Sequence, residues 1–444
     1  MHSSKEVFMK VTFKNIGIIE EADICFDGLT VIAGENDTGK STIGKLMFSL
    51  IKTFNRYERD ARSYQVHNIQ TIIDDYYFEF RKEKIDSSVL EAGKTFFDEL
   101  KNETLSLINR EISREEAQSI IFEKLKNFIG FVQGLADIQI DIKGLSGKLA
   151  GLVHKKPGKE EIFKQTFGKY MGSMFSSEIV NKFTGLQEYL IVGKEGNTVI
   201  FEISGKNSVG ELKLYDRLYF EDATFIESPI LLNLADTLRF SKTLFDKNGE
   251  TRKQAELLEK SYVPEYMKDF MLKLTERSPQ EQTSDVIANI RDIIKGDFYY
   301  DHKENDFIFK KENKIFKGLS ISPGIKYLGS ISILEQVDFL NKKSLLIMDE
   351  PETHIHPQWQ IRFAEVLVKL VKQGSNILLT SHSPYLIEAL KLYSDKLLEE
   401  SCVNFYLSEG IEKKFTSQIY NVTHDVSPIF DILADPLDKL EALQ

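Results

Sequence analysis

The sequence predicts an α/β fold built around a buried parallel sheet, and two stretches far apart in the chain support this prediction. The first, LTVIAG at residues 29–34, is an apolar run that leads directly into the segment GENDTGKS. The second, SLLIMDEPETHIHP at residues 344–357, is an apolar run that ends in two adjacent acids. Short apolar runs bounded by turn residues are typical of strands that are buried on both faces. Each expected strand therefore delivers polar residues at its carboxyl end.

The segment GENDTGKS, residues 34–41, matches the phosphate-loop pattern G-x-x-x-x-G-K-[ST] between an expected strand and an expected helix at 41–54. In such a loop the backbone amides and the helix N-terminus face a phosphate. The sequence thus predicts that the chain binds ATP and Mg²⁺, with Lys40 on the terminal phosphates and Ser41 on the metal. The complete set of expected nucleotide-binding residues in the loop is Gly34, Glu35, Asn36, Asp37, Thr38, Gly39, Lys40, Ser41 and Thr42.

The acid pair at the end of the second strand supplies the chemistry that a bound nucleotide needs. We expect Asp349 to support Mg²⁺ together with Ser41. Glu350 is one residue further on and faces elsewhere, so it can orient and deprotonate the attacking water as a general base. The pattern therefore predicts an ATPase in which Glu350 is catalytic.

Composition and charge exclude several classes of protein. The chain has 444 residues, of which 42% are hydrophobic and 28% are charged, as is ordinary for globular proteins. A net charge of −11 does not indicate a nucleic-acid-binding surface, so nucleic acid would bind only at a local patch. No apolar run approaches the roughly 18 residues of a membrane span, and we expect a cytoplasmic protein with no membrane partner. The two cysteines, Cys25 and Cys402, are too few for a disulfide framework.

Changes in residue pattern divide the chain into five expected parts. Residues 1–54 and 342–444 form the two halves of the ATPase head, with the phosphate loop in the first and the acid pair in the second. Residues 55–184 read as polar helices, residues 185–227 as an antiparallel subsheet of the head, and residues 228–341 as a helical lobe.

The helical insertion at 55–184 contains two well-marked helices. One is expected at 87–110, and a second follows the capping box Ser113-Arg-Glu-Glu116 and runs to about Gly134. The apolar spacing does not persist beyond a few turns, so we expect a compact domain and not a long coiled coil. Residues 154–169 are the best local basic candidate, but their interleaved acids favour a solvated linker over a nucleic-acid contact.

The second half of the chain alternates between short strands and helices. A run of strands is expected from Glu188 to Ile226, with the last strand returning to the main sheet. A helix opened by Ser284 and closed by Gly296 follows, and then a hairpin within 297–316. A small polar loop then opens a helix at about Gly324.

Two further motifs make the phosphate-loop interpretation more specific. Ser322-Pro-Gly324-Ile-Lys326 resembles the signature loop of ABC-type ATPases, and NILLTSHSP resembles their switch-histidine loop. This resemblance implies that Ser322 and Gly324 close over the nucleotide of a second subunit in a head-to-tail dimer or a higher oligomer. It also implies that His382 contacts the γ-phosphate. Pro323 departs from the usual pattern and leaves one fewer amide for the phosphate.

The two motifs DEPETHIHP and TSHSPYLIEAL resemble those of the ABC-type, SMC- and OLD-like ATPases of the AAA family. The resemblance is to ATPase subunits of bacterial antiphage systems such as Septu or PARIS in particular. The resemblance covers about residues 8–54 and 185–430. OLD enzymes carry a Toprim nuclease domain after the ATPase, and the segment after His382 is too short for one. We therefore expect a separate nuclease subunit, of HNH or Toprim type.

Three assignments have alternatives. His354, His356 and His382 could be read as a zinc or iron site with the nearby acids, although no second carboxylate cluster supports it. The glutamine that usually couples the nucleotide to the helical lobe has no clear counterpart, and by position it falls near residues 227–229. Trp359 and Phe363 are expected in the core of a helix and not in a stacking platform.

The sequence therefore predicts an ABC-type P-loop ATPase head with an antiparallel β-subdomain, a helical lobe and an inserted helical domain. Its expected function is slow ATP hydrolysis that senses or gates a partner effector nuclease in antiphage defence. The competing hypothesis is a DNA-repair or chromosome-maintenance ATPase of the SMC type. Proteins of that type are expected to have long coiled-coil arms and a basic surface, neither of which this sequence indicates. The nucleotide-binding subunit of a transporter fits less well, because the insertion is large and the motif D-E-P-E-T-H differs from the corresponding motif D-E-P-T of transporters.

Overall fold

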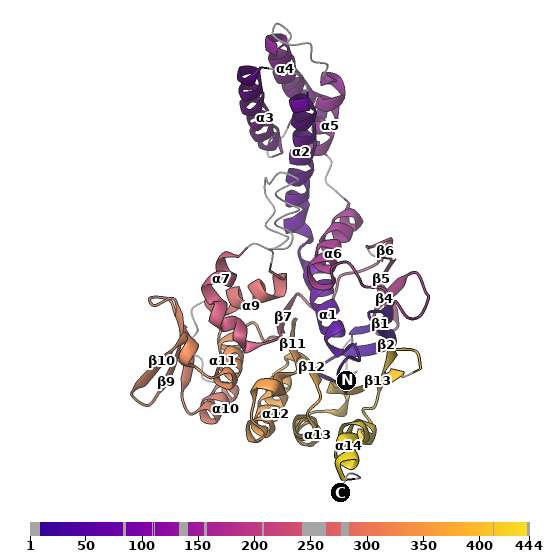
Figure 1. Ribbon diagram of the computed structural model, residues 1–444, viewed down its shortest axis with the longest axis vertical. Coiled ribbons are helices and arrows are strands. Elements are labelled where there is room, and N and C mark those ends of the chain that lie inside the picture. The colour runs from indigo at the N-terminus through magenta and orange to yellow at the C-terminus, as the bar shows by residue number, and fades with distance from the viewer. Residues whose placement is uncertain are drawn as a thin grey trace, which may run out of the picture. The chain divides into compact units, whose positions relative to one another are not determined.

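The protein divides into two compact units, which we call the head unit and the helical unit. The head unit consists of Met1–Asn55, Phe167–Phe245 and Ser261–Gln444, and the helical unit of Arg56–Thr166 and Asp246–Lys260. The structure is a computed structural model (Figure 1). It describes residues 9–82, 86–108, 110, 112–132, 141–154, 158–206, 208–241, 263–276, 284–411 and 413–441.

A mixed sheet forms the centre of the head unit. In the described part of the chain this sheet has eleven strands in the order β6-β5-β4-β1-β2-β14-β13-β3-β12-β11-β7. The strands are β1 (Met9–Ile16), β2 (Ile19–Phe26), β3 (Leu29–Gly34), β4 (Tyr189–Glu195), β5 (Thr198–Gly205), β6 (Glu211–Leu214), β7 (Asp222–Ile226), β11 (Ser344–Asp349), β12 (Asn376–Ser381), β13 (Val403–Ile411) and β14 (Thr416–Asn421).

Five neighbouring strands, from β13 to β7, run parallel and bring the predicted motifs to one edge. All six residues of β3 and all six of β12 are buried, as their apolar composition predicts. The register pairs Ser381 of β12 with Ala33 of β3, and Thr380 of β12 with Asp349 of β11. Parallel strands end at the same edge of a sheet, so the phosphate loop, the acid pair and the residues before His382 become neighbours there.

The strands that the sequence predicts between Glu188 and Ile226 are present and belong to the same sheet. β4 pairs antiparallel with β1 from Met9↔Glu195 to Lys14↔Leu190, and β5 and β6 continue the antiparallel edge. β7 pairs parallel with β11. The antiparallel strands are therefore an extension of the central sheet.

Helix α1 (Lys40–Asn55) packs on the parallel strands, and a glycine allows it to come close. A Cβ at Gly44 would lie 2.9 Å from the ring of Phe225 in β7 and 3.0 Å from Cγ2 of Ile347 in β11. At its other end, Lys52 donates to Asp222 at 2.5 Å and to Asp269 of α9 (Glu265–Thr275) at 2.7 Å. Burial would lower the pKa of Lys52, but the two carboxylates raise it above the usual value. The helix is thus fixed at both ends.

Most of the remaining helices of the head unit, labelled in Figure 1, contribute residues to one large apolar core. Phe363 is fully buried in it and Trp359 packs against it, which confirms the prediction that both belong to the core. None of the described helices combines the length and hydropathy that a bilayer crossing requires. The elements not yet named are η1 (Pro229–Leu234), α7 (Ala235–Phe240), α10 (Asp285–Ile294), η4 (Pro351–His354), α12 (Pro357–Lys372), α13 (Pro384–Leu397), η5 (Glu400–Cys402) and α14 (Ser427–Glu441).

A second, smaller sheet follows α10 and differs slightly from the prediction. Ser284 caps the helix as expected, but the residue in left-handed conformation at its end is Lys295, with φ 55°. Glycine is required at position 296 for a different reason, because a Cβ there would lie 2.5 Å from the carbonyl oxygen of Lys310.

The predicted hairpin gains a third strand, giving β8 (Asp297–Asp301), β9 (Asp306–Lys311) and β10 (Lys314–Lys317). Helix α11 (Pro323–Gln336) begins where the sequence predicts a helix, after η3 (Gly318–Ser320).

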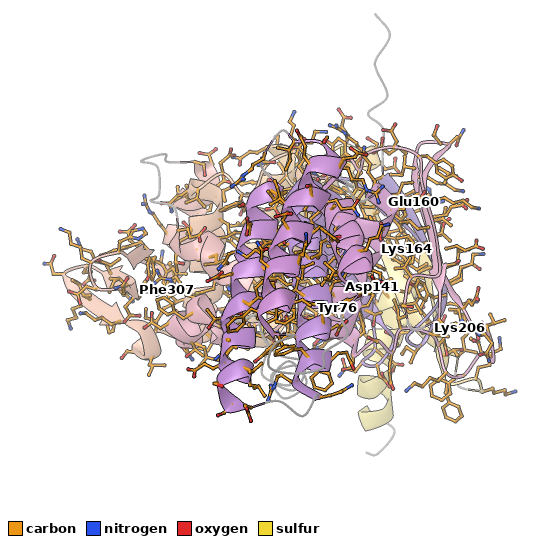
Figure 2. The ribbon with its side chains drawn as sticks, turned by 90° about the horizontal axis from the view of Figure 1, so that it is seen from above. Tyr76, Asp141, Glu160, Lys164, Lys206 and Phe307 are labelled. Carbon is orange, nitrogen blue, oxygen red and sulfur yellow. The ribbon has the colours of Figure 1, made fainter. Side chains whose placement is uncertain are left out.

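The helical unit has a core of its own, built from α2 (Tyr57–Lys82), α3 (Ser87–Leu107), α4 (Arg114–Val132) and α5 (Ile142–His154). The predicted capping box is formed, since Ser113 N–H donates to Glu116 Oε2 at 2.7 Å and Glu116 N–H to Ser113 Oγ at 3.1 Å. Phe96 and Phe128 stack with ring centroids 3.9 Å apart. Tyr76, labelled in Figure 2, packs against the same core.

Two sequence predictions fall partly outside the described residues. Gly134, the expected end of the second insertion helix, lies outside them, and α4 is described to Val132. Residues 155–157 of the basic stretch 154–169 lie outside them as well, and the stretch continues in α6 (Lys159–Phe175).

We expect Gly44→Ala to lower the thermal unfolding midpoint of the protein. The added methyl group would press on Phe225 and Ile347. Such overpacking costs roughly 1–3 kcal/mol, which exceeds the gain of about 1 kcal/mol in helix propensity. Gly168→Ala in α6 is the matched control, because a Cβ there meets no described atom within 4 Å, and it should raise the midpoint. Equal shifts in the two variants would show that α1 can move away from the sheet.

Candidate active site

The phosphate loop between β3 and α1 has a backbone that requires glycine at two positions. Gly34 has φ 149° and its Cβ would lie 2.1 Å from the carbonyl oxygen of Ser408, while Gly39 has φ 87° and its Cβ would lie 2.6 Å from Cγ1 of Ile19. Asp37 takes a positive φ of 57° without being glycine. The loop is therefore held in a conformation that most side chains would prevent.

Two serines of the strands β13 and β14 hold the loop from behind. The hydroxyl groups of Ser408 and Ser417 each donate to the carbonyl oxygen of Thr38 at 2.8 Å. Thr38 Oγ1 in turn donates to the carbonyl oxygen of Glu35 at 2.9 Å. The carbonyl of Thr38 is thus engaged by strands β13 and β14, which fixes the backbone of the loop.

Lys40 is buried, with 3% of its surface exposed, and its ammonium group lies inside the loop. Nζ donates to the carbonyl oxygens of Gly34 at 3.0 Å and Glu35 at 2.6 Å, and lies 3.7 Å from Glu350 Oε1. Burial lowers the pKa of Lys40, and the carboxylates of Glu350, Asp349 and Glu352 oppose that shift. A cation held by carbonyls and a carboxylate is placed to exchange these partners for phosphate oxygens.

Asp349 ends strand β11 beside the hydroxyl groups of two neighbouring elements. Thr380 Oγ1 donates to Asp349 Oδ1 at 2.6 Å, and Ser41 also hydrogen-bonds to this carboxyl group. Burial raises the pKa of Asp349, against the effect of these two bonds. A partly buried carboxylate next to a hydroxyl group gains from a nearby cation. Oxygen donors of this kind are the ligands that Mg²⁺ prefers, so Asp349 and Ser41 fit the metal that the sequence predicts.

Glu350 points to a different part of the site from its neighbour. Its backbone is left-handed, with φ 46° and ψ 55°, and its N–H donates to the carbonyl oxygen of Thr380 at 3.1 Å. A non-glycine residue in this conformation costs about 1 kcal/mol or more. The turn aims the Glu350 carboxylate at Lys40, and also at His382, whose Nδ1 lies 3.5 Å from Oε1. The two adjacent acids thus contact different side chains of the site.

His382 lies between two carboxylates at the carboxyl end of β12. Its Nδ1 is 3.4 Å from Glu352 Oε1, and this nitrogen has no hydrogen-bond partner among the described residues. Glu352 is buried, and its Oε1 accepts the hydroxyl of Ser381 and the N–H of His382, both at 2.7 Å. Burial raises the pKa of Glu352 against these bonds. Glu352 therefore fixes the backbone that carries His382.

The predicted signature residues lie at a separate place, at the start of α11. Ser322 is the N-cap of that helix, with an extended backbone, and Pro323 is its first residue. Gly324 packs closely, because a Cβ there would lie 2.8 Å from the carbonyl oxygen of His354 and 3.5 Å from the ring of Trp359. Whether these residues meet a nucleotide held by another subunit stays a prediction.

Glu227 occupies the position that the sequence suggested for the coupling residue, directly after β7. Its carboxylate lies 3.4 Å from Nζ of Lys45 in α1 and accepts the hydroxyl of Tyr266 in α9. Burial and this carboxylate raise the pKa of Tyr266 well above its usual value. Glu227 therefore connects the phosphate-loop helix with a helix of the expected helical lobe.

The three histidines considered as an alternative metal site have separate partners. His354 hydrogen-bonds to Ser228 at 3.2 Å, and His356 accepts the N–H of Gln358 at 3.3 Å. His382 faces Glu350 and Glu352. Within the residues that the structure describes, no three His, Cys, Asp or Glu side chains form a group that could hold a metal ion.

Several residues that shape this site are not predicted from the sequence. Glu352 has a local signal, since it is a third acid in DEPETH, and Thr380 lies within the expected switch-histidine loop. Ser408 and Ser417 had none, because they lie in strands about 370 residues further along the chain than the loop they hold.

We expect Glu352→Ala to destabilise the head unit by at least about 2 kcal/mol, because it leaves the buried hydroxyl of Ser381 and the N–H of His382 without an acceptor. Urea denaturation followed by the fluorescence of Trp359, the single tryptophan, measures this. Glu352→Gln keeps an acceptor oxygen and should recover most of the loss. Glu365→Ala, which removes a half-exposed ion pair with Lys369, is the control and should change little. Equal stability of the two alanine variants would contradict this role.

Comparisons with known proteins identify the family of this chain. Residues 9–387 match the family model described as AAA ATPase domain. The Septu protein PtuA of Bacillus thuringiensis is 28% identical over 114 residues, which are 25% of this chain and 26% of that protein. The chain thus spans about a quarter of the length of the curated relative it matches.

Among solved structures, the SMC head domain from Thermotoga maritima is similar with a TM-score of 0.37 and 11% identity, over 94% of this chain and 98% of the other. An Smc head with a coiled coil from Pyrococcus yayanosii has a TM-score of 0.37 and 11% identity, over 97% and 99% of the two chains. The head unit has an α/β fold with the phosphate loop between β3 and α1 and the acid pair at the end of β11. With a family model matched from residue 9 to residue 387, the chain belongs to the AAA ATPase domain family.

Proposed function

We propose that this protein binds and slowly hydrolyses ATP as the regulatory subunit of an antiphage defence system, in which it senses a trigger or gates a separate effector nuclease. One observation supports the ATPase part above all others. Lys40, from the phosphate loop, and His382, from the end of β12, both lie within 4 Å of the Glu350 carboxylate. The ammonium of Lys40, the carboxylate of Glu350 and the imidazole of His382 thus lie together, where we expect the terminal phosphate of ATP.

Each residue of the site has a separate task in the proposed reaction. Lys40 and the loop amides bind the terminal phosphates. Asp349 and Ser41 hold Mg²⁺, which supplies positive charge to the phosphate oxygens. Glu350 orients the attacking water and accepts its proton, and His382 donates a hydrogen bond to the γ-phosphate.

The proposed site is completed by a second copy of the chain. Ser322 and Gly324, at the N-terminus of α11, bind the γ-phosphate held by the other subunit in a head-to-tail dimer. The helix N-terminus and the glycine backbone suit an anion, and the close packing of Gly324 on His354 ties α11 to the segment after Glu350. Closure of the dimer is then sensitive to whether ATP or its product is bound.

The proposed role in defence rests on sequence similarity. The chain is similar to Septu protein PtuA over 114 residues. Its motifs resemble ATPase subunits of antiphage systems, and from this resemblance we infer a partner nuclease of HNH or Toprim type. A net charge of −11 gives no support to direct nucleic-acid binding by the whole surface. We expect the effector nuclease to be a separate polypeptide that co-purifies with the tagged protein.

Lys40→Ala is expected to abolish ATP binding while leaving the fold intact. A methyl group cannot neutralise the terminal phosphates. Burial disfavours the charged form of Lys40 and lowers its pKa, so loss of this ammonium group should not unfold the chain. Isothermal titration with ATP and Mg²⁺ measures the affinity, and circular dichroism checks the fold. Unchanged nucleotide affinity would contradict the role of this lysine.

Glu350→Gln and Asp349→Ala should separate chemistry from metal binding. Glutamine keeps the size of the side chain but loses the base, so hydrolysis should slow by about 10²–10⁴-fold while ATP remains bound. The variant should accumulate as an ATP-bound closed dimer.

Asp349→Ala should instead lose Mg²⁺-dependent affinity for ATP as well as turnover. Light scattering and bound-nucleotide content, with ATP and with or without Mg²⁺, distinguish the two; wild-type turnover of Glu350→Gln would place the base elsewhere.

Mixing two inactive variants tests the composite site. Lys40→Ala removes one half of it and Gly324→Asp the other, so a heterodimer retains one intact site. We expect partial recovery of ATP hydrolysis on mixing, relative to either variant alone at the same total concentration. Activity that only equals the sum of the two separate variants would count against a site shared between subunits.

A further inference from the structure

Strand β10 is an exposed edge of the small sheet. It pairs with β9 only, in the sheet order β10-β9-β8 of the described residues, and all four of its residues are exposed. Ile315 is 60% and Phe316 38% exposed, and Leu319 just beyond the strand is 80% exposed. Figure 1 shows β9 and β10 projecting from the rest of the head unit, and Figure 2 labels Phe307 of β9 in this small sheet. An edge of this kind offers unpaired backbone groups beside apolar side chains.

The charge of this edge is opposite to that of the chain. Four lysines, Lys310, Lys311, Lys314 and Lys317, lie on β9 and β10 of a protein whose net charge is −11. Lys317 pairs with Glu304 at 2.7 Å, and within the described residues the other three make no ion pair. Lys314 and Lys317 flank the exposed pair Ile315-Phe316 in the strand.

We propose that β10 binds an extended segment of a partner protein as an added antiparallel strand, with the pattern acidic–apolar–apolar–acidic. Main-chain hydrogen bonds to the free edge would supply affinity, and the side-chain pairs would supply specificity. In antiparallel register the acids of the segment face Lys317 and Lys314, and its apolar residues face Phe316 and Ile315. Two of the four positions thus attract by charge and two bury apolar surface.

A second copy of this chain fits the edge less well. Antiparallel pairing of β10 with itself would place Lys314 of one copy opposite Lys317 of the other at both ends of the strand. Like charges directly opposite each other destabilise a strand pair. Lysines on an edge strand prevent it from pairing with a second copy. Preventing this pairing does not require the exposed apolar residues Ile315 and Phe316 between the lysines. The edge therefore suits a partner with acidic groups.

The position of β10 connects this docking edge to the proposed signature loop. The strand ends at Lys317, η3 follows as Gly318–Ser320, and Ser322 caps α11. Ile321 is buried, and Gly318 has φ 37° with its Cβ position 2.8 Å from the Asp306 carboxylate, so the connection is tightly packed. A strand bound at β10 would restrain the residues that lead to Ser322. This coupling, unlike the docking itself, rests on the proposed function.

The docking is tested with synthetic peptides and the full-length chain. A fluorescent peptide Ser-Gly-Glu-Val-Val-Glu-Gly-Ser should bind with a Kd below about 1 mM in fluorescence anisotropy, and at least about tenfold more tightly than the same peptide with lysine for glutamate. Lys314→Glu should weaken the acidic peptide about threefold to tenfold at low salt. Lys213→Glu on β6, the edge strand of the large sheet, is the matched control and should change nothing.

A backbone variant makes the test independent of charge. The two-residue turn between Lys311 and Lys314 makes these residues a hydrogen-bonded pair, so the N–H of Ile315 points away from β9. Ile315→Pro removes this donor and should abolish peptide binding, whereas Ile315→Val should retain it. No saturable binding of the acidic peptide, equal binding of both peptides, or binding unaffected by Lys314→Glu would overturn the proposal. So would a labelled oligonucleotide that binds this edge through Lys314 while the peptide does not.

Two further measurements separate the docking from the ATPase. Peptide binding to Lys40→Ala needs no nucleotide, so it should match the wild type even if the proposed ATPase function fails. In the wild type, saturating peptide should change the rate of ATP hydrolysis, and Lys314→Glu should reduce this response without altering the basal rate. A rate that does not respond to bound peptide would overturn the connection between β10 and the signature loop.

Discussion

The parallel alignment of β3, β12 and β11 is the constraint on which the rest of this structure depends. Their register places Ala33 beside Ser381 and Thr380 beside Asp349, so that three turns far apart in sequence begin at one edge of the sheet. The backbone of β12 also accepts the N–H of Glu350, which joins two of these turns directly. A shift of one residue in this register would reverse the direction of every side chain in the strand and separate the carboxylate from its hydroxyl partners.

Burial gives the charged groups at this edge their chemical character. The pKa of Lys40 is lowered and those of Asp349 and Glu352 are raised, in each case chiefly because the charged form loses water. Such groups gain more from an added charge of opposite sign than exposed groups do. Lys40 lies 3.7 Å from the carboxylate of Glu350, and a nucleotide with its metal would supply new partners for charges of both signs.

The supports of the site come from elements with no motif of their own. Ser408 and Ser417 hold the loop carbonyl of Thr38, and Lys52 and Lys273 bracket Asp222 at the far end of β7. Burial would raise the pKa of Asp222, but the two lysines lower it below its usual value. Removal of one partner from a buried pair costs more than the pair itself contributes, because an unpaired charge is left inside. The helix that carries Lys40 is therefore held through its phosphate loop and through Lys52 near its C-terminal end.

The sequence by itself determined the elements that depend on local pattern. The strands around the loop, the capping box at Ser113, the cap at Ser284 and the positions of Lys40 and Asp349 all follow from residue spacing, because neighbouring side chains decide turns, caps and buried runs. Only the tertiary structure decided which distant groups meet. The contact of Glu352 with His382, the serines behind Thr38, the third strand of the small sheet and the left-handed Lys295 in place of Gly296 are examples. Contacts of this kind arise from the packing of segments far apart in the chain, and no local pattern in a single sequence records them.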